Sequence, residues 1–231
     1  MFRSNRKTDR HPERAARLLA PVFGLLVLAA SALPALSQAA APAQPPTARE
    51  HMQARLAEVS RILLAPDTER QAKRDSVQKL IDASVDFETV SRLVLAQNWN
   101  KFSEAQRKDF VDLFRKHLLH TYWKNADYSN FAGIEVTGDR KEQRRDWTVM
   151  TKVKNRGSEN ILIDYRLRAQ GEEGTPALEW RIIDILVEGV SLVANFRSQF
   201  QSIVANDGPE QLNAQLREKV AQAEREQAGS K

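Results

Sequence analysis

The chain has 231 residues, a net charge of +5 and no cysteine. The lack of cysteine excludes disulfide bridges, thiolate metal sites and cysteine nucleophiles, so stability must come from a packed core. Six of the basic residues and two of the acidic ones fall within residues 1–39, which leaves the rest of the chain nearly neutral at about +1. Nucleic-acid binding needs a strong basic field. We therefore expect no nucleic-acid partner.

The N-terminal segment is typical of a secretory signal. A basic stretch up to Arg17 is followed by a run from Leu18 to Leu36 without any charge, and small residues come next at 37–41. This order matches a signal peptide with its cleavage site. An uncleaved membrane anchor is the alternative, but two prolines and a glycine interrupt the apolar run. We expect removal of residues 1–39 and export.

The remaining chain divides by composition. Residues 40–48 contain three prolines and four alanines, which predicts a flexible linker. Residues 49–220 have the length of a single domain with its own core. Residues 221–231 are predicted to be a C-terminal tail.

Apolar residues recur every three or four positions between residues 49 and 122, which predicts helices. The first two are expected over 49–64 and 69–83, with Pro66 preventing continuation of the first. Asp86 is placed to cap a third helix, and Ser103 with Gln106 forms a capping-box pattern for a fourth. The apolar residues of the fourth cover a wider arc than one packing stripe needs.

After Tyr128 the apolar period changes from 3.6 to 2, which predicts strands near residues 134–137, 147–154 and 161–168. Turns are expected at Gly138–Asp139, 155–158 and 171–174, and turns this short indicate an antiparallel meander. A last strand over 178–187 is apolar on both faces. Its alternation predicts Ile182 on one face and Ile183 with Ile185 on the other.

Ser191 is placed to cap a helix after the last strand, and Gly208–Pro209 is expected to break that helix and begin another. Helices grouped apart from an antiparallel meander predict an α+β domain. We expect a curved sheet of about four strands wrapped by N- and C-terminal helices. Periodicity does not separate a tight core from a ligand cavity, because the same residue types line both.

Candidate catalytic groups are few. His117 and His120 lie three apart on the fourth helix without a third ligand, so we interpret them as ordinary helix-face histidines and expect no metal. Asp164 and Asp184 lie on strands, and a carboxylate beside an apolar cavity can act as a general base. A small-molecule isomerase therefore stays open as an alternative. We expect no enzyme and predict no catalytic residue.

Two segments of the second half stand out, Ile163–Leu167 and the longer Trp180–Phe200. They closely resemble the signature of the MlaC family of periplasmic phospholipid-binding proteins, also called toluene-tolerance proteins. The helical half also agrees with the family pattern, through Asp86-Phe87-Glu88, Leu93, Leu95, Trp99, Phe110, Phe114, Leu118 and Thr121-Tyr122. The resemblance covers roughly residues 71–219. The chain departs from the family at residues 94–99, where a glycine and an aromatic residue are commoner before the tryptophan.

The resemblance implies a cone-like fold and a function. Family members carry glycerophospholipids between an outer-membrane lipoprotein complex and an inner-membrane ABC transporter with an MCE-domain protein, which maintains outer-membrane lipid asymmetry. By this resemblance the chain is a periplasmic, monomeric carrier that buries acyl chains, contacts membranes only transiently and uses no cofactor. A carrier of another amphiphile, such as a hopanoid, is an alternative.

The matched segments give the expected lipid contacts. Aspartate at Val149 or Ile163 is predicted to abolish lipid binding. The full predicted set is Val94, Phe110, Phe114, Leu118, Tyr122, Val149, Val153, Ile163, Tyr165, Leu167, Trp180, Ile182, Val190, Val193, Phe196 and Phe200.

Overall fold

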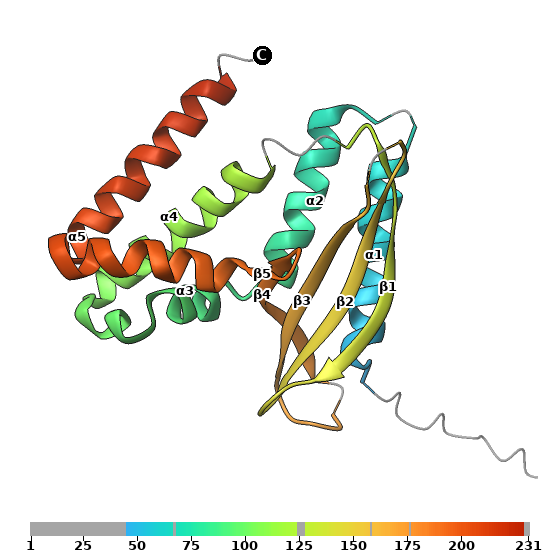
Figure 1. Ribbon diagram of the computed structural model, residues 1–231, viewed down its shortest axis with the longest axis horizontal. Helices are drawn as coiled ribbons and strands as arrows, with labels where there is room; N and C mark the ends of the chain where they lie inside the picture. The colour runs from blue at the N-terminus through green and yellow to red at the C-terminus, as the bar shows by residue number, and fades with distance from the viewer. Residues whose placement is uncertain (1–44, 67, 124–127, 158, 176, 229–231) are drawn as a thin grey trace, which may run out of the picture. The chain divides into compact units, whose positions relative to one another are not determined.

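The computed structural model describes residues 45–66, 68–123, 128–157, 159–175 and 177–228 (Figure 1). The first half is helical and comprises α1 (Ala48–Leu64), α2 (Arg70–Ser84), α3 (Phe87–Leu95), the 3₁₀ helix η1 (Ala96–Lys101) and α4 (Glu104–Trp123). The second half comprises β1 (Phe131–Lys141), β2 (Asp146–Asn155), β3 (Ile161–Gln170), β4 (Glu179–Val187), β5 (Val190–Ser191) and α5 (Leu192–Ala228). The predicted α+β class is confirmed.

The helix starts follow from local side-chain capping. Asp86 accepts a hydrogen bond from the Thr89 amide at 2.9 Å, and Ser191 Oγ accepts one from an amide in the first turn of α5 at 3.0 Å. At the start of α4, Ser103 and Gln106 each accept the backbone N–H of the other, at 3.0 and 3.2 Å. Each cap satisfies an N–H group that the helix itself leaves without a partner. The three predicted caps are confirmed.

The sheet is an antiparallel meander in the order β1-β2-β3-β4-β5, as predicted. The predicted first turn at Gly138–Asp139 is wrong, because β1 continues to Lys141. A register shift between Val136 and Gly138 lets the glycine pair with Met150 as part of a bulge. The chain turns instead at residues 142–145, where Arg144 has a φ of +60°. Gly138 therefore marks a bulge within a strand rather than its end.

The pairing of β3 with β4 also contains a register shift. Arg166 is opposite Asp184 and Leu167 is opposite Ile182, so Ile183 is an extra residue on β4. The bulge places Ile182 and Ile185 in the same hydrophobic cluster, on the face covered by α1. The predicted separation of Ile182 from Ile185 is wrong, because an extra residue reverses the alternation beyond it.

The structure describes part of each segment that flanks the predicted domain, residues 45–48 and 221–228. α5 is interrupted at Gly208, which has a φ of 84°, as expected, and its second part continues to Ala228 through residues that were predicted to form a tail. The predicted linker is partly structured, since Ala48 begins α1 and the Pro46 carbonyl accepts a hydrogen bond from Trp180 Nε1 at 2.8 Å. The predicted signal, residues 1–39, lies outside the described residues.

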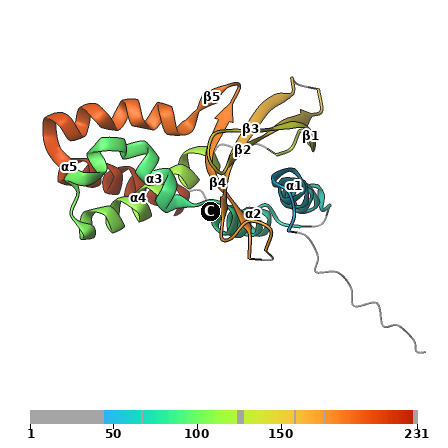
Figure 2. The same cartoon turned by 90° about the horizontal axis from the view of Figure 1, so that it is seen from below.

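Apolar side chains form two main clusters in separate layers. In Figure 2, α3, α4 and α5 group on one side of β4 and β5, while α1 and α2 lie against the sheet. The sheet cluster joins α1 to the covered face of the sheet and consists of Ala48, Met52, Leu56, Val149, Leu167, Ala169, Trp180 and Ile182 with their half-buried neighbours. The helix cluster joins α3, η1, α4 and α5 through residues that include Val94, Trp99, Phe102, Phe110, Phe114, Phe196, Phe200, Leu212 and Leu216.

We expect the turn between β3 and β4 to depend on glycine at position 171. Gly171 has a φ of +83°, and a Cβ there would collide with the Ala177 carbonyl oxygen. Gly174 has a similar φ of +78° but open space around it. Gly174→Ala should therefore lower the free energy of unfolding by about 1 kcal/mol, from backbone strain alone. Gly171→Ala should cost at least about 3 kcal/mol. Urea denaturation checks both, and equal losses would contradict the collision.

Candidate functional site

A largely apolar cavity of about 280 Å³ lies where the two clusters meet. Its walls come from α1 and α2, from α3, α4 and the start of α5, and from the covered face of the sheet. Such a volume is near the lower end for small-molecule pockets. The residues that line it are Met52, Arg55, Leu56, Val59, Val77, Leu80, Ile81, Ser84, Val85, Phe87, Val90, Val94, Phe114, Leu118, Leu119, Tyr122, Ile134, Tyr165, Ile182, Asp184, Ile185, Leu192 and Val193.

The cavity brings together part of the predicted lipid-contact set. These residues come from α3, α4, β3, β4 and α5, so distant parts of the sequence meet around one cavity. They are Val94, Phe114, Leu118, Tyr122, Tyr165, Ile182 and Val193. Their contact with lipid stays a prediction.

The other predicted residues do not line this cavity. Phe110, Phe196 and Phe200 are interior members of the helix cluster, where their rings and that of Phe114 pack with centroids 5.1 to 6.0 Å apart. The remainder lie in or beside the sheet. Val149, Leu167 and Trp180 pack in the sheet cluster, Val153 packs near Phe131, Ile163 is half-buried on β3, and Val190 is 60% exposed.

Sequence reasoning missed the contributions of α1 and α2. Met52, Leu56 and Val59 were recognised as the apolar face of a helix, but periodicity gave no reason to place that face at a cavity. Val77 and Ile81 on α2 complete this wall. A helical stripe identifies buried positions, and the packing partner decides whether they meet another side chain or a void.

A few polar groups interrupt the apolar walls. Burial raises the pKa of the Tyr165 phenol to about 12, so the phenol is neutral at physiological pH. Arg55 is half-buried on α1, and no described carboxylate lies within ion-pair distance of it. Tyr122, at the C-terminal end of α4, is 44% exposed and marks a side where the wall meets solvent. These groups are too few to make the interior polar.

The buried carboxylate of Asp184 connects β4 to the start of α5 by hydrogen bonds. Asp184 is 4% exposed and accepts hydrogen bonds from Ser191 Oγ at 2.6 Å, from the Ile185 amide at 2.9 Å and from the Val193 amide at 3.1 Å. A negative charge at a helix N-terminus is stabilised by the helix dipole. Asp164 pairs with Met150 and Leu186 in the sheet and does not line the cavity. Asp184 therefore holds the start of α5, and Asp164 lies away from the cavity.

The histidines of α4 are separate from the cavity. The His117 ring packs edge-on against Phe196 with centroids 5.8 Å apart, and burial lowers the pKa of its imidazole. Within the described residues, no group of three or more His, Asp or Glu side chains is placed to hold a metal ion. No helix in the same part of the chain has the length and apolar character needed to span a membrane.

The family model described as MlaC protein matches residues 53–218, which include the helix cluster, the sheet cluster except Ala48 and Met52, and all cavity-lining residues except Met52. The chain belongs to the MlaC family. The resemblance seen in the sequence is thereby confirmed.

This MlaC-family chain is also similar to two individual proteins, one by sequence and one by fold. It is 24% identical over 135 residues to the toluene tolerance protein ttg2D of Pseudomonas putida, a match that covers 58% of this chain and 60% of that protein. Its fold is similar to that of the phospholipid-binding protein from Ralstonia solanacearum, solved in complex with a phospholipid, with a TM-score of 0.65 and 22% identity. That similarity covers 77% of this chain and 99% of the Ralstonia chain.

We predict that the Asp184 carboxylate contributes measurably to stability. Asp184→Asn removes the charge and replaces one acceptor oxygen by a donor that faces the amides of α5. This should lower the free energy of unfolding by about 1 to 3 kcal/mol. Asp164→Asn is the matched control, on the neighbouring strand and without a comparable set of donors. Urea denaturation at pH 7 measures both, and a control as damaging as the test variant would disprove the assignment.

Proposed function

We propose that this MlaC-family chain is a periplasmic carrier that binds glycerophospholipids by their acyl chains in the apolar cavity. One observation carries the proposal: a largely apolar cavity lies between the helices and the sheet, and all of its lining residues except Met52 fall within the residues that the family model matches. The Ralstonia protein of the same fold holds a phospholipid. The cavity walls suit methylene chains because they make non-directional contacts and few hydrogen bonds.

The physical need for such a carrier follows from the cost of exposing lipid to water. Each exposed CH₂ costs about 0.8 kcal/mol, so a two-chain lipid does not cross an aqueous compartment unaided at a useful rate. A carrier lowers this cost by shielding the chains. Binding through apolar contacts, without deep polar anchors, also allows release when a partner offers another apolar path.

The proposal includes shuttling between membranes. Export through the N-terminal signal would place the carrier in the periplasm, between an outer-membrane lipoprotein complex and an inner-membrane MCE-domain ABC transporter. Membership of the MlaC family supports these partners and a role in outer-membrane lipid asymmetry. Reconstitution of each partner in separate vesicles with a fluorescent phospholipid tests this role. Transfer that does not depend on the carrier would oppose it.

The geometry gives little support to an isomerase. The one aspartate at the cavity, Asp184, is occupied by three hydrogen bonds. Native mass spectrometry of protein purified from the periplasm distinguishes the carrier alternatives. A co-purified mass matching a two-chain phospholipid supports the proposal, and a polycyclic ligand would favour a hopanoid carrier. Protein that stays empty even after incubation with lipid would reject both.

We predict that a buried charge in the cavity wall prevents lipid binding. Ile185 lines the cavity on β4, and Ile185→Asp would place a carboxylate against the acyl chains, a desolvation that costs several kcal/mol. Bound phospholipid should fall at least about 10-fold by native mass spectrometry.

Ile163→Asp is the matched control. Ile163 is also a half-buried isoleucine of the sheet, near Val187 of β4, but it is not part of the cavity wall. We therefore expect the control to keep its lipid, in contrast to the sequence-based expectation for this position. At Val149, which is completely buried in the sheet cluster, aspartate should cause unfolding instead. A folded Ile185→Asp protein with full lipid content would exclude this wall as the acyl site.

A further inference from the structure

A second cavity, of about 240 Å³, lies between α2, α4 and the end of α5. Unlike the first, it is lined almost entirely by polar and charged side chains. They are Arg74 and Gln78 from α2, Arg115, Lys116, Leu119 and His120 from α4, and Glu224 and Gln227 from α5. We call it the polar cavity.

The polar cavity adjoins the apolar one. Leu119 lines both, so the two spaces share a wall on α4. The ion pair between Arg115 and Asp82 connects α4 to α2 at this boundary, with N–O distances of 2.8 and 2.5 Å. The Arg115 guanidinium also lies 5.9 Å from the ring centre of Phe87, which lines the apolar cavity. The headgroup of an amphiphile whose tail occupies the apolar cavity would therefore lie near the polar cavity.

The side chains of the polar cavity favour an anionic head. Arg74, Arg115 and Lys116 are cationic, and Glu224 is the one carboxylate in the lining. The hydrogen bonds that Arg115 donates to Asp82 and Lys116 donates to Asp112 raise the pKa of both cations, so both stay charged at neutral pH. Arginine and lysine are the side chains that bind phosphate oxygens best.

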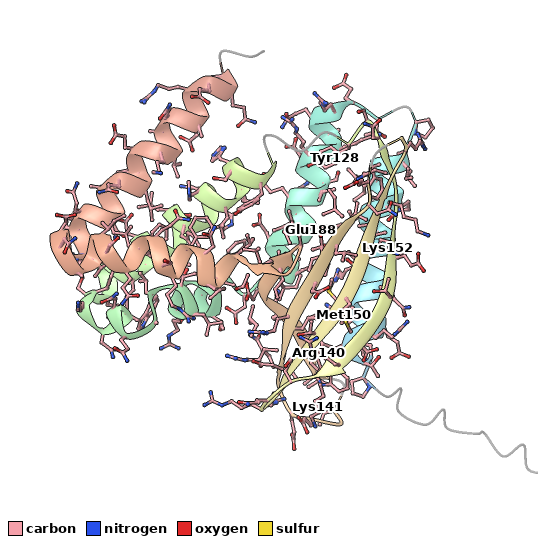
Figure 3. All side chains as sticks on the ribbon, viewed as in Figure 1. Tyr128, Arg140, Lys141, Met150, Lys152 and Glu188 are labelled. Carbon is pink, nitrogen blue, oxygen red and sulfur yellow. The ribbon has the colours of Figure 1, made fainter. Side chains whose placement is uncertain are left out.

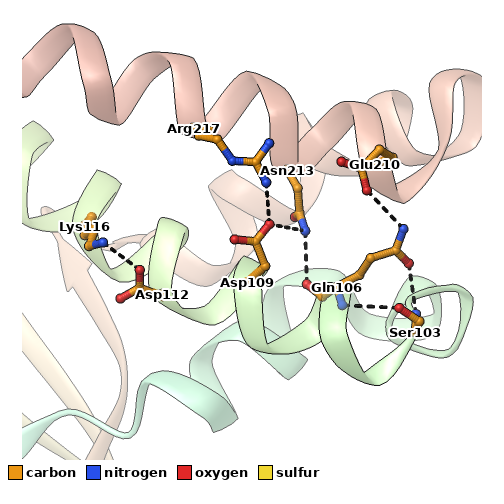
Figure 4. A network of polar contacts seen from close by, with 8 residues as sticks. All are labelled: Ser103, Gln106, Asp109, Asp112, Lys116, Glu210, Asn213 and Arg217. Atoms are coloured by element: carbon orange, nitrogen blue, oxygen red, sulfur yellow. Dashed lines mark hydrogen bonds and ion pairs between the residues drawn. The ribbon is translucent and has the colours of Figure 1, made fainter.

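Two of these cations keep donors that their ion pairs do not use. Arg115 donates to Asp82 through Nε and Nη2, which leaves Nη1 without a hydrogen-bond partner among the described residues. Lys116 Nζ contacts Asp112 Oδ2, one turn earlier on the same helix, at 2.7 Å (Figure 4), and the Lys116 side chain is 41% exposed. An ammonium group has three donors, so this contact leaves capacity for another acceptor.

We propose that the polar cavity binds the phosphate of a phospholipid headgroup while the acyl chains occupy the apolar cavity. Arg115 and Lys116 donate to the phosphate oxygens, and Leu119 separates the head from the tails. This inference rests on the proposed carrier function and adds a headgroup class to it: lipids with a phosphate bind better than lipids with the same chains and none.

The test compares dioleoyl phosphatidylglycerol with dioleoylglycerol, which has the same acyl chains but no phosphate. Delipidated protein is incubated with vesicles that contain equal amounts of both, and native mass spectrometry gives the ratio of the two complexes. We expect the wild-type protein to prefer phosphatidylglycerol at least about 10-fold, the effect of one or two charge-assisted hydrogen bonds.

Two variants remove the donors, and one variant serves as a matched control. The double variant Arg115→Gln/Asp82→Asn removes the guanidinium without leaving an unpaired carboxylate, and Lys116→Gln removes the ammonium group. Each should reduce the preference at least about 3-fold, as measured by the same ratio. Lys108→Gln removes an exposed charge from the same helix, outside both cavities, and should keep the wild-type ratio. Circular dichroism confirms that each variant is folded.

The outcomes separate this inference from the carrier function. Wild-type protein that binds both lipids equally would overturn the headgroup site and leave the carrier intact. Protein that binds neither lipid would reject the carrier function itself. Calorimetry with inorganic phosphate tests a free anion as the ligand. Phosphate binding that the variants lose, together with equal binding of the two lipids, would assign the cavity to free phosphate and overturn the headgroup proposal.

Discussion

The arrangement of the domain depends on a short stretch of β4, residues 182–184. The Ile182 carbonyl accepts the Asp86 amide at 3.0 Å, which fixes the start of α3, and the Asp184 carboxylate accepts the Val193 amide, which fixes the start of α5. The bulge at Ile183 makes both contacts compatible, because the extra residue changes the direction in which the following side chain points. Strand β4 thus connects the helix cluster to the sheet cluster through one backbone and one carboxylate hydrogen bond. The side chains of the two clusters do not need to pack into one another for this connection.

A cavity is the consequence of joining two clusters along one strand. Each cluster is packed internally, as the fully buried Phe110 and Val149 show. Beside the cavity, an ion pair between Arg115 and Asp82 links α4 to α2. The apolar groups that line the void lack the dispersion contacts of a filled core, so an acyl chain would restore contacts that the protein alone does not make. Ligand binding of this kind also stabilises the folded state by mass action.

The sequence predicted the features that depend on neighbouring residues. The caps at Asp86, Ser103 and Ser191 were recognisable because a side chain satisfies an amide within the same turn. The bulges at Gly138 and Ile183 were not, since a bulge is defined by the partner strand, and each changed an expectation about a turn or a face. The cavity was predicted only in part for a related reason. Apolar periodicity marks burial, whereas the difference between core and cavity depends on what lies opposite each side chain.

A carrier must release what it binds, and the two adjoining cavities differ in a way that suits this need. The apolar cavity offers affinity that scales with buried area and falls as soon as a chain begins to leave. The Lys116–Asp112 ion pair at the polar cavity is partly exposed, with Lys116 41% and Asp112 53% exposed, so it contributes only about 0 to 1 kcal/mol. Exchange of the lysine between Asp112 and a phosphate therefore costs little in either direction. The cations of the polar cavity thus select the headgroup without binding the lipid too tightly for release. A partner with cations of its own would bind the phosphate with a similar free energy.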